Sequence, residues 1–198
     1  MAKPTPWLVP AVWTGGAMPA FALAVQLGQD ALGANPVSTA LNRLGLLALI
    51  FLTLTLACTP AKTLLGWVWP QRIKRQLGLL GFGYVCLHLL MYLGDQGFSL
   101  GTMLDDVAKR PFITVGVLAW ALLVPLAVTS TDAWVKRLTF VQWKQLHRLS
   151  YVCTVLGGIH FFLRVKKDVT EPVLYLAAVG ALLAVRAVAY VRKRRQAA

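Results

Sequence analysis

Three histidines are the residues of this sequence best suited to chemistry, and each lies in or beside a long apolar run: His88, His147 and His160. An ionisable side chain within a membrane span is energetically costly and is a functional candidate by default. A neutral imidazole is a good axial ligand for iron, and two imidazoles that face each other between helices can hold a haem. The histidines therefore predict a haem site, provided that their helices bring two of them to the same depth.

The composition is that of a membrane protein. Hydrophobic residues make up 58% of the 198-residue chain and charged residues 14%, and the mean hydropathy is +0.65. Soluble domains are usually about 45–50% apolar and about 25% charged. Because so many apolar residues cannot be hidden inside one small globule, the composition excludes a soluble enzyme, a disordered chain and a secreted disulfide scaffold.

Six apolar runs approach the roughly 20 residues that a helix needs to cross a bilayer core of about 30 Å. The expected spans are residues 7–27, 41–59, 76–94, 111–130, 146–163 and 172–191. Helices are favoured over a barrel because these runs are continuous and do not alternate with polar residues. We expect an all-α integral membrane protein, a six-transmembrane-helix bundle that forms one domain over residues 1–198. The second span is expected to stop at Pro60, and the first to be retained, not cleaved as a signal peptide.

The loop charges predict an orientation. With the N-terminus inside, thirteen basic residues against one acid, Asp132, fall on the inner side, and six basic residues against six acids fall on the outer side. The inner set is Lys3, Lys62, Arg72, Lys74, Arg75, Lys136, Arg137, Lys144, Arg148, Arg192, Lys193, Arg194 and Arg195, and the outer set is Arg43, Lys109, Arg110, Arg164, Lys166 and Lys167. This split satisfies the positive-inside rule with both termini in the cytoplasm of a bacterial cell, so the net charge of +13 predicts topology and no nucleic-acid partner.

Counting residues along the spans predicts which histidines meet. His88 lies toward the outer side of the third span, and His160 lies thirteen residues, or roughly 20 Å of helix, beyond His147 at the inner edge. His88 and His160 should therefore share a depth, while His147 is too far away to bind the same iron. At about 100° per residue, His147 and His160 do not share a helix face unless a bend at Gly157–Gly158 realigns them; otherwise they face different partners. Five tryptophans mostly fall near the expected interfaces, and an aromatic belt explains them better than a role in electron hopping: Trp67, Trp69, Trp120, Trp134 and Trp143.

The residues alone leave several alternatives open. A second, inner haem would need a histidine where Lys74 and Arg75 stand, and both are protonated cations, so one haem is expected, with two as the alternative. His147 is a candidate second haem ligand, a flavin or quinone contact, or a helix-end residue. The chain could also be a stand-alone ferric or cupric reductase, or a non-redox small transporter with structural histidines. Arg186 is the one charge deep within a span, which argues against the transporter.

Several motifs in order resemble the MsrQ family, haem-binding membrane subunits of the bacterial MsrPQ methionine sulfoxide reductase systems within the ferric-reductase-like transmembrane group. The matching segments are Gly33-Ala34-Asn35-Pro36-Val37, Arg75-Gln76-Leu77-Gly78-Leu79, Leu87-His88-Leu89, Arg110-Pro111-Phe112, Thr129-Ser130-Thr131, residues 143–151 and Ile159-His160. The resemblance covers nearly the whole chain, and it is the combination of motifs that is specific.

The resemblance implies an electron conduit, not the catalytic subunit. Members carry haem b, are associated with FMN, and pass electrons across the inner membrane to MsrP, a periplasmic molybdenum enzyme that reduces methionine sulfoxide in oxidised proteins. The implied electron donor is a cytosolic flavin reductase or a membrane quinol. His88, His147 and His160 match the family's histidines, whereas Lys74 and Arg75 stand where the wider oxidase group has a fourth one.

Overall fold

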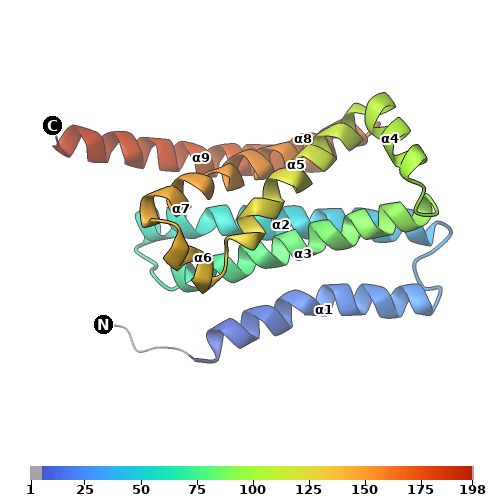
Figure 1. Cartoon of the computed structure of the whole chain (residues 1–198), viewed down its shortest axis with the longest axis horizontal. Coiled ribbons are helices and arrows are strands. Elements are labelled where there is room, and N and C mark those ends of the chain that lie inside the picture. Colours follow the sequence, from blue (N-terminus) through green and yellow to red (C-terminus); the bar gives the residue numbers. More distant parts are fainter. Residues whose placement is uncertain (1–5, 198) are drawn as a thin grey trace.

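The computed structural model describes residues 6–197, and within this range the chain forms nine α-helices (Figure 1). They are α1 (Leu8–Gly28), α2 (Pro36–Leu65), α3 (Pro70–Asp95), α4 (Leu100–Lys109), α5 (Pro111–Val128), α6 (Asp132–Arg137), α7 (Phe140–Leu146), α8 (Leu149–Arg164) and α9 (Thr170–Ala197). Lys3, which was assigned to the inner side, lies outside the described residues.

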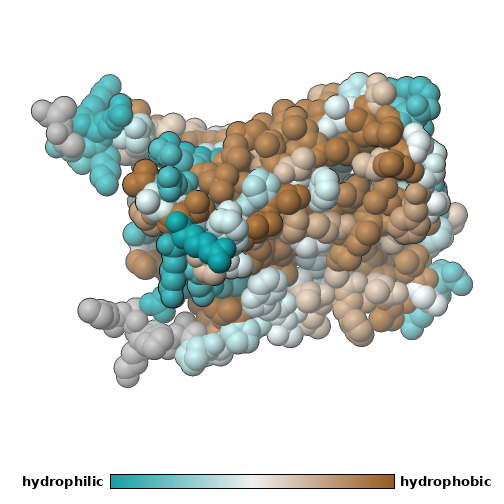
Figure 2. Space-filling model, in the orientation of Figure 1, coloured by the Kyte–Doolittle hydropathy of each residue, from teal (hydrophilic) through white to brown (hydrophobic). Residues whose placement is uncertain are grey.

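Six stretches of helix are long and apolar enough to cross a membrane: α1, α2, α3, α5, the consecutive α7 and α8, and α9. Large apolar side chains on their outward faces are exposed, for example Phe21 at 72% and Leu174 at 63%. Figure 2 shows a broad hydrophobic band between hydrophilic ends. The prediction of an all-α, six-span bundle is confirmed, and the protein is a multi-pass membrane protein.

Local sequence signals set many of the helix ends. Proline occupies the first turn of α2, α3 and α5, where its missing N–H is not needed. The Asn35 side chain accepts a hydrogen bond from the amide of Ser38 and so caps α2. At the other end of α2, Gly66 adopts φ 70°, a left-handed conformation that ends helices and that glycine adopts without strain. Because these signals start and end the helices at defined residues, the loops between them are short.

Two helix pairs form the centre of the bundle. α2 packs along α3, α5 packs along α8, and the two pairs contact each other through α3 with α5 and α2 with α8. α1 lies on the outside against α3, and α9 lies against α8 and α2 (Figure 1). The buried Tyr84 hydroxyl joins α3 to α1, since it donates to the Gly16 carbonyl at 2.6 Å and accepts from the Ala20 amide at 3.1 Å. The centre of the fold is thus a four-helix arrangement of α2, α3, α5 and α8.

The two sets of basic residues lie at opposite ends of the bundle. The end that carries α6, α7 and the C-terminal turns of α9 holds the described members of the larger set, and α4 lies at the other end (Figure 1). At the first end, Arg75 forms an ion pair with Asp132 that ties α3 to α6. The hydrogen bond and charge of Arg75 lower the pKa of the Asp132 carboxyl below its usual value. Arg75 is therefore engaged by a carboxylate.

The prediction that the second span stops at Pro60 is wrong, because α2 continues to Leu65. A proline inside a helix leaves the carbonyl four residues earlier without its amide partner. Here that carbonyl belongs to Leu56, and it accepts a hydrogen bond of 2.6 Å from Nη2 of Arg186 on α9. Nη1 of Arg186 donates to the Tyr151 hydroxyl at 2.9 Å, so the one deep cation also joins α9 to α8. Arg186 thus stabilises the helix where proline weakens it.

Replacing Arg186 with methionine is expected to lower the free energy of unfolding by about 1–3 kcal/mol, because it leaves the Leu56 carbonyl buried and unpaired. In a Pro60→Ala background the new amide at position 60 can satisfy that carbonyl, so the same substitution should cost less. Denaturation of the four proteins in detergent measures this difference. If Arg186→Met lowers the free energy of unfolding equally in both backgrounds, Arg186 does not compensate for the hydrogen bond that Pro60 removes.

Candidate functional site

His88 and His160 lie together in the structure. His88 extends from α3 and His160 from α8, and their ring centroids are 6.0 Å apart with ring planes at 89°. Residue counting predicts that these two side chains share a depth in the membrane, and the structure places them in contact. No residue of the short helices α4, α6 or α7 takes part in this pairing.

A backbone carbonyl orients each of the two imidazoles. Nδ1 of His88 lies 2.9 Å from the Leu41 carbonyl oxygen of α2, and Nδ1 of His160 lies 2.6 Å from the Phe112 carbonyl oxygen of α5. Because a carbonyl can only accept, Nδ1 carries the proton in both rings and Nε2 carries the lone pair. Within the described residues neither Nε2 has a hydrogen-bond partner. Both rings thus present a free nitrogen ligand.

A cavity of about 590 Å³ lies between α2, α3, α5 and α8, and both histidines line it. Its volume falls within the range of about 300–1,000 Å³ that is usual for ligand and cofactor sites. The deeper walls are mainly apolar and include Ala48, Leu49, Leu52, Val85, Trp120, Leu123 and Cys153. The prediction that Trp120 belongs to an interfacial belt is wrong: it lies within α5 and faces this cavity, because α5 turns that side toward α8.

These features fit a haem held by two histidines. The two ring centroids lie 6.0 Å apart, so both imidazoles are close enough to serve one bound cofactor. The apolar walls suit a porphyrin, and the hydrogen bond at each Nδ1 is the support that metal-binding histidines usually have. His88 of α3 and His160 of α8 are therefore the residues that could hold a haem iron in this cavity.

Three arginines reach the mouth of the cavity, and two of them have only neutral partners. Arg43 donates to the Gln26 side chain at 2.6 Å, and Arg164 donates to the Asn42 side chain. Arg110, in contrast, forms an ion pair with Asp106 at 3.1 Å. In the part of the chain that the structure describes, Arg43 and Arg164 have no carboxylate partner. Their positive charges remain available to an anionic group in the cavity.

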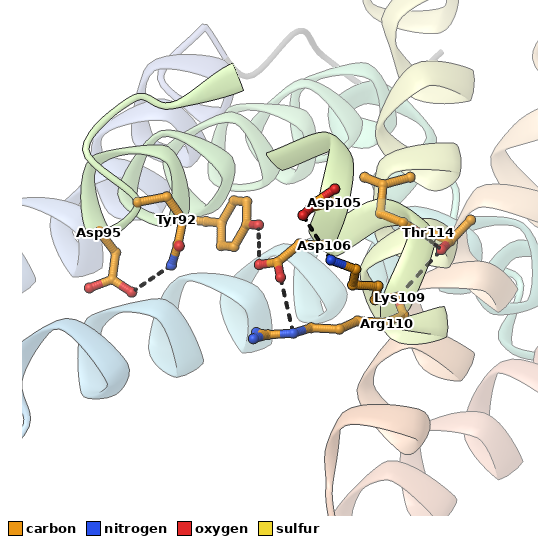
Figure 3. Close-up of polar contacts among 9 residues, drawn as sticks. Tyr92, Asp95, Asp105, Asp106, Lys109, Arg110 and Thr114 are labelled. Atoms are coloured by element: carbon orange, nitrogen blue, oxygen red, sulfur yellow. Dashed lines mark hydrogen bonds and ion pairs between the residues drawn. The ribbon is translucent and has the colours of Figure 1, made fainter. Parts of the chain in front are cut away.

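Helix α4 is fixed beside this mouth by a buried carboxylate (Figure 3). Asp106 accepts a hydrogen bond of 2.8 Å from the Tyr92 hydroxyl on α3 and pairs with Arg110 at the start of α5. Lys109 and Asp105 form a second, exposed ion pair on α4. Across the mouth, hydrogen bonds from the side chain and the amide of Thr170 lower the pKa of the Asp168 carboxyl. The rim therefore carries charges of both signs in fixed positions.

His147 occupies a separate site at the other end of the bundle. Its ring stacks on Trp143 with centroids 3.9 Å apart, and its Nε2 lies 3.1 Å from the Thr129 hydroxyl. Since that hydroxyl donates to the Pro125 carbonyl at 2.7 Å, Nε2 of His147 is the donor to Thr129. His147 does not line the described cavity and presents the opposite tautomer to the other two histidines.

Gly157 and Gly158 lie within α8, which is α-helical without interruption from Leu149 to Arg164. The helix axis breaks instead at His147 and Arg148, between α7 and α8. His147 and His160 therefore face different partners, which was the other alternative left by the helix geometry.

The functional neighbours that sequence reasoning missed are Leu41, Gly45, Phe112, Gly116, Arg43 and Arg164. No sequence pattern pointed to the two carbonyls, because each lies 47 or 48 residues from its histidine in the chain and only the packing of the helices brings them together.

Comparison with known proteins identifies the family of the chain. The family model described as "Ferric reductase like transmembrane component" matches residues 44–158. A Rhodospirillum rubrum protein is 49% identical over 189 residues, covering 95% of this chain and 86% of the relative; a Deinococcus radiodurans protein is 49% identical over 180 residues, covering 89% of each. A Brucella ovis protein is 42% identical over 197 residues, covering 98% of this chain and 89% of the relative. All three are named "Protein-methionine-sulfoxide reductase heme-binding subunit MsrQ".

Proposed function

This chain belongs to the MsrQ family of ferric-reductase-like transmembrane proteins, and from that membership we propose that it is a haem b electron-transfer subunit of a methionine sulfoxide reductase system. The observation that carries the proposal is the pair of free Nε2 atoms of His88 and His160 at one cavity. Its partner would be a periplasmic, molybdenum-dependent, MsrP-like enzyme that repairs oxidised methionines in proteins.

The chain's own residues would hold the cofactor in three ways. His88 and His160 would supply the nitrogens that bind the iron, and Leu49, Leu52 and Leu123 would supply apolar walls. Arg43 and Arg164, which have neutral partners, would face the haem carboxylates at the mouth. When bound, a haem supplies an iron that changes its charge by one electron. The protein's part is to set the ligands, to keep the deep wall dry and to leave the mouth accessible.

The charge distribution supports an orientation in the bacterial inner membrane. The end with α6, α7 and the C-terminus carries most of the basic residues and would face the cytoplasm under the positive-inside rule. The histidine cavity opens at the other end, which would then face the periplasm. This placement puts the cavity mouth, with α4 at its rim, next to the periplasmic partner.

Electrons would enter at the cytoplasmic end from a flavin reductase or a quinol. Basic side chains there, for example Lys136 and Lys144, would attract an anionic flavin such as FMN or an acidic donor protein. The aromatic pair of Trp143 and His147 lies at the same end and is the contact we propose for a flavin or quinone ring. Reduction of one sulfoxide consumes two electrons and two protons, so a one-electron carrier must be oxidised twice for each methionine repaired.

The test uses the purified full-length protein in detergent. A dithionite-reduced minus oxidised spectrum should show a b-type haem, and addition of the molybdoenzyme with methionine sulfoxide should then reoxidise it. Reduced protein with sulfoxide but without the molybdoenzyme is the control and should stay reduced. A well-folded protein without haem would overturn the proposal. Haem that the molybdoenzyme cannot oxidise, but that ferric citrate can, would identify a ferric reductase instead.

A further inference from the structure

We propose that Gly45 and Gly116 are positioning residues that hold the two cavity histidines in their ligand-ready tautomer, an inference that rests on the proposed haem site. Each glycine lies directly against one imidazole ring. A Cβ built on Gly45 would lie 3.2 Å from both Cε1 and Nδ1 of His88. A Cβ on Gly116 would lie 2.7 Å from Nδ1 and 2.9 Å from Cε1 of His160.

Helix geometry explains why the position must lack a Cβ. The carbonyls that receive the imidazoles belong to Leu41 and Phe112, which are each four residues before one of the glycines. In an α-helix the Cα–Cβ bond tilts toward the N-terminus, so a side chain covers the turn that precedes its own residue. A side chain at position 45 or 116 would therefore cover the carbonyl four residues earlier. Glycine leaves that carbonyl open to a second donor from a neighbouring helix.

The same arrangement occurs twice. In the first pair of helices, α2 supplies Leu41 and Gly45 to His88 of α3; in the second pair, α5 supplies Phe112 and Gly116 to His160 of α8. Two segments far apart in the sequence thus share one arrangement. In each, a helix carbonyl accepts a hydrogen bond from an imidazole of the partner helix, and a glycine follows that carbonyl four residues later. We name each of these a carbonyl latch. Because the arrangement occurs at both histidines, it indicates that the site requires oriented imidazoles, and that the glycines do more than let one pair of helices pack closely.

The latch has a chemical consequence for the ligand. It fixes the proton on Nδ1, directs Nε2 into the cavity and makes the imidazole a stronger base. A more basic ligand favours ferric over ferrous iron, so the two latches hold the reduction potential of the site down. Losing one latch while keeping both ligands is expected to raise that potential. A glycine that served only to let helices approach would not produce this shift.

The variants Gly116→Ala and Gly45→Ala test the proposal. Gly116→Ala should lose more, because its Cβ would overlap the His160 ring, and we expect haem affinity to fall by about 10–100-fold, as when a supporting partner of a metal ligand is removed. In Gly45→Ala the new Cβ would lie farther from the His88 ring than the Cβ of Gly116→Ala lies from His160. This variant should therefore keep its low-spin haem but have a raised reduction potential. Gly83→Ala on α3 is the matched control, because nothing lies within 4 Å of its Cβ position, and it should match wild type.

A second measurement does not depend on the cofactor. The ¹⁵N chemical shifts of the histidine rings in the haem-free protein should show Nδ1-protonated His88 and His160, and Gly116→Ala should change the His160 signal alone. Wild-type affinity, potential and ¹⁵N shifts in both latch variants would overturn the latches while leaving the haem proposal intact. A wild-type protein that binds no haem, yet shows these tautomers, would overturn the proposed function and leave the latches standing.

Discussion

Replacing His160 or His88 with alanine is expected to abolish the low-spin haem spectrum, because each substitution removes one of the two imidazoles that line the cavity. Loss of a ligand should exceed the about 10–100-fold loss of affinity that follows removal of a supporting partner. Haem content per polypeptide and the oxidised and reduced absorption spectra of the purified variants measure the effect. Imidazole added to the buffer can enter the space left by the ring and should restore part of the low-spin signal.

His147→Ala is the matched control for these two variants. Its ring lies outside the cavity, stacked on Trp143 and bonded to Thr129, so the haem spectrum should survive. If the flavin or quinone contact proposed for this histidine is correct, the variant should instead be reduced more slowly by a flavin or quinol donor. If His147→Ala loses haem and only one of His88→Ala and His160→Ala does so, the proposed ligand pair is wrong.

Replacing both Arg43 and Arg164 with glutamine is expected to weaken haem binding by about a hundredfold. A hydrogen bond to a charged group contributes about 1.5–3 kcal/mol, and about 1.4 kcal/mol corresponds to a factor of ten. Both guanidinium groups lie at the mouth with amide partners only, so their loss removes positive charge that would face the haem carboxylates. The reduction potential should fall as well, because less positive charge disfavours uptake of an electron.

Titration of the haem-free protein with haem measures this affinity, and a redox titration measures the potential. Lys109→Gln is the control, since it removes one positive charge at the same end from an exposed ion pair that does not line the cavity. It should bind haem as wild type does. Equal affinities for the control and the double arginine variant would show that the two arginines do not contribute to binding.

The sequence alone determined the class of the protein and the depth of its histidines. Long apolar runs predicted six membrane spans because the length of an apolar helix is a local property that the bilayer thickness selects. The family resemblance that its motifs carried is confirmed by the relatives. Residue counting from the span ends placed His88 and His160 together because a helix rises by a fixed distance per residue.

Local rules failed where a distant residue changed their outcome. Pro60 did not end α2, because Arg186 of α9 satisfies the carbonyl that the proline leaves free. The glycines at 157 and 158 did not interrupt α8, and the helix is interrupted instead at His147, whose ring contacts Trp143 and Thr129. In both places a side-chain contact joins the predicted span to residues outside it, which local sequence rules do not consider.

Only the tertiary structure decided how the histidines are used. The carbonyl that orients each ring is 47 or 48 residues away in the chain, and no sequence rule connects such positions before the helices are packed. The same holds for Gly45 and Gly116, which look like ordinary small residues within apolar helices until the imidazole of a neighbouring helix is seen against them. Hydropathy and helix rise fix the depth of a residue along its own axis, whereas the tautomer and direction of a ring depend on the donors and acceptors that packing places around it.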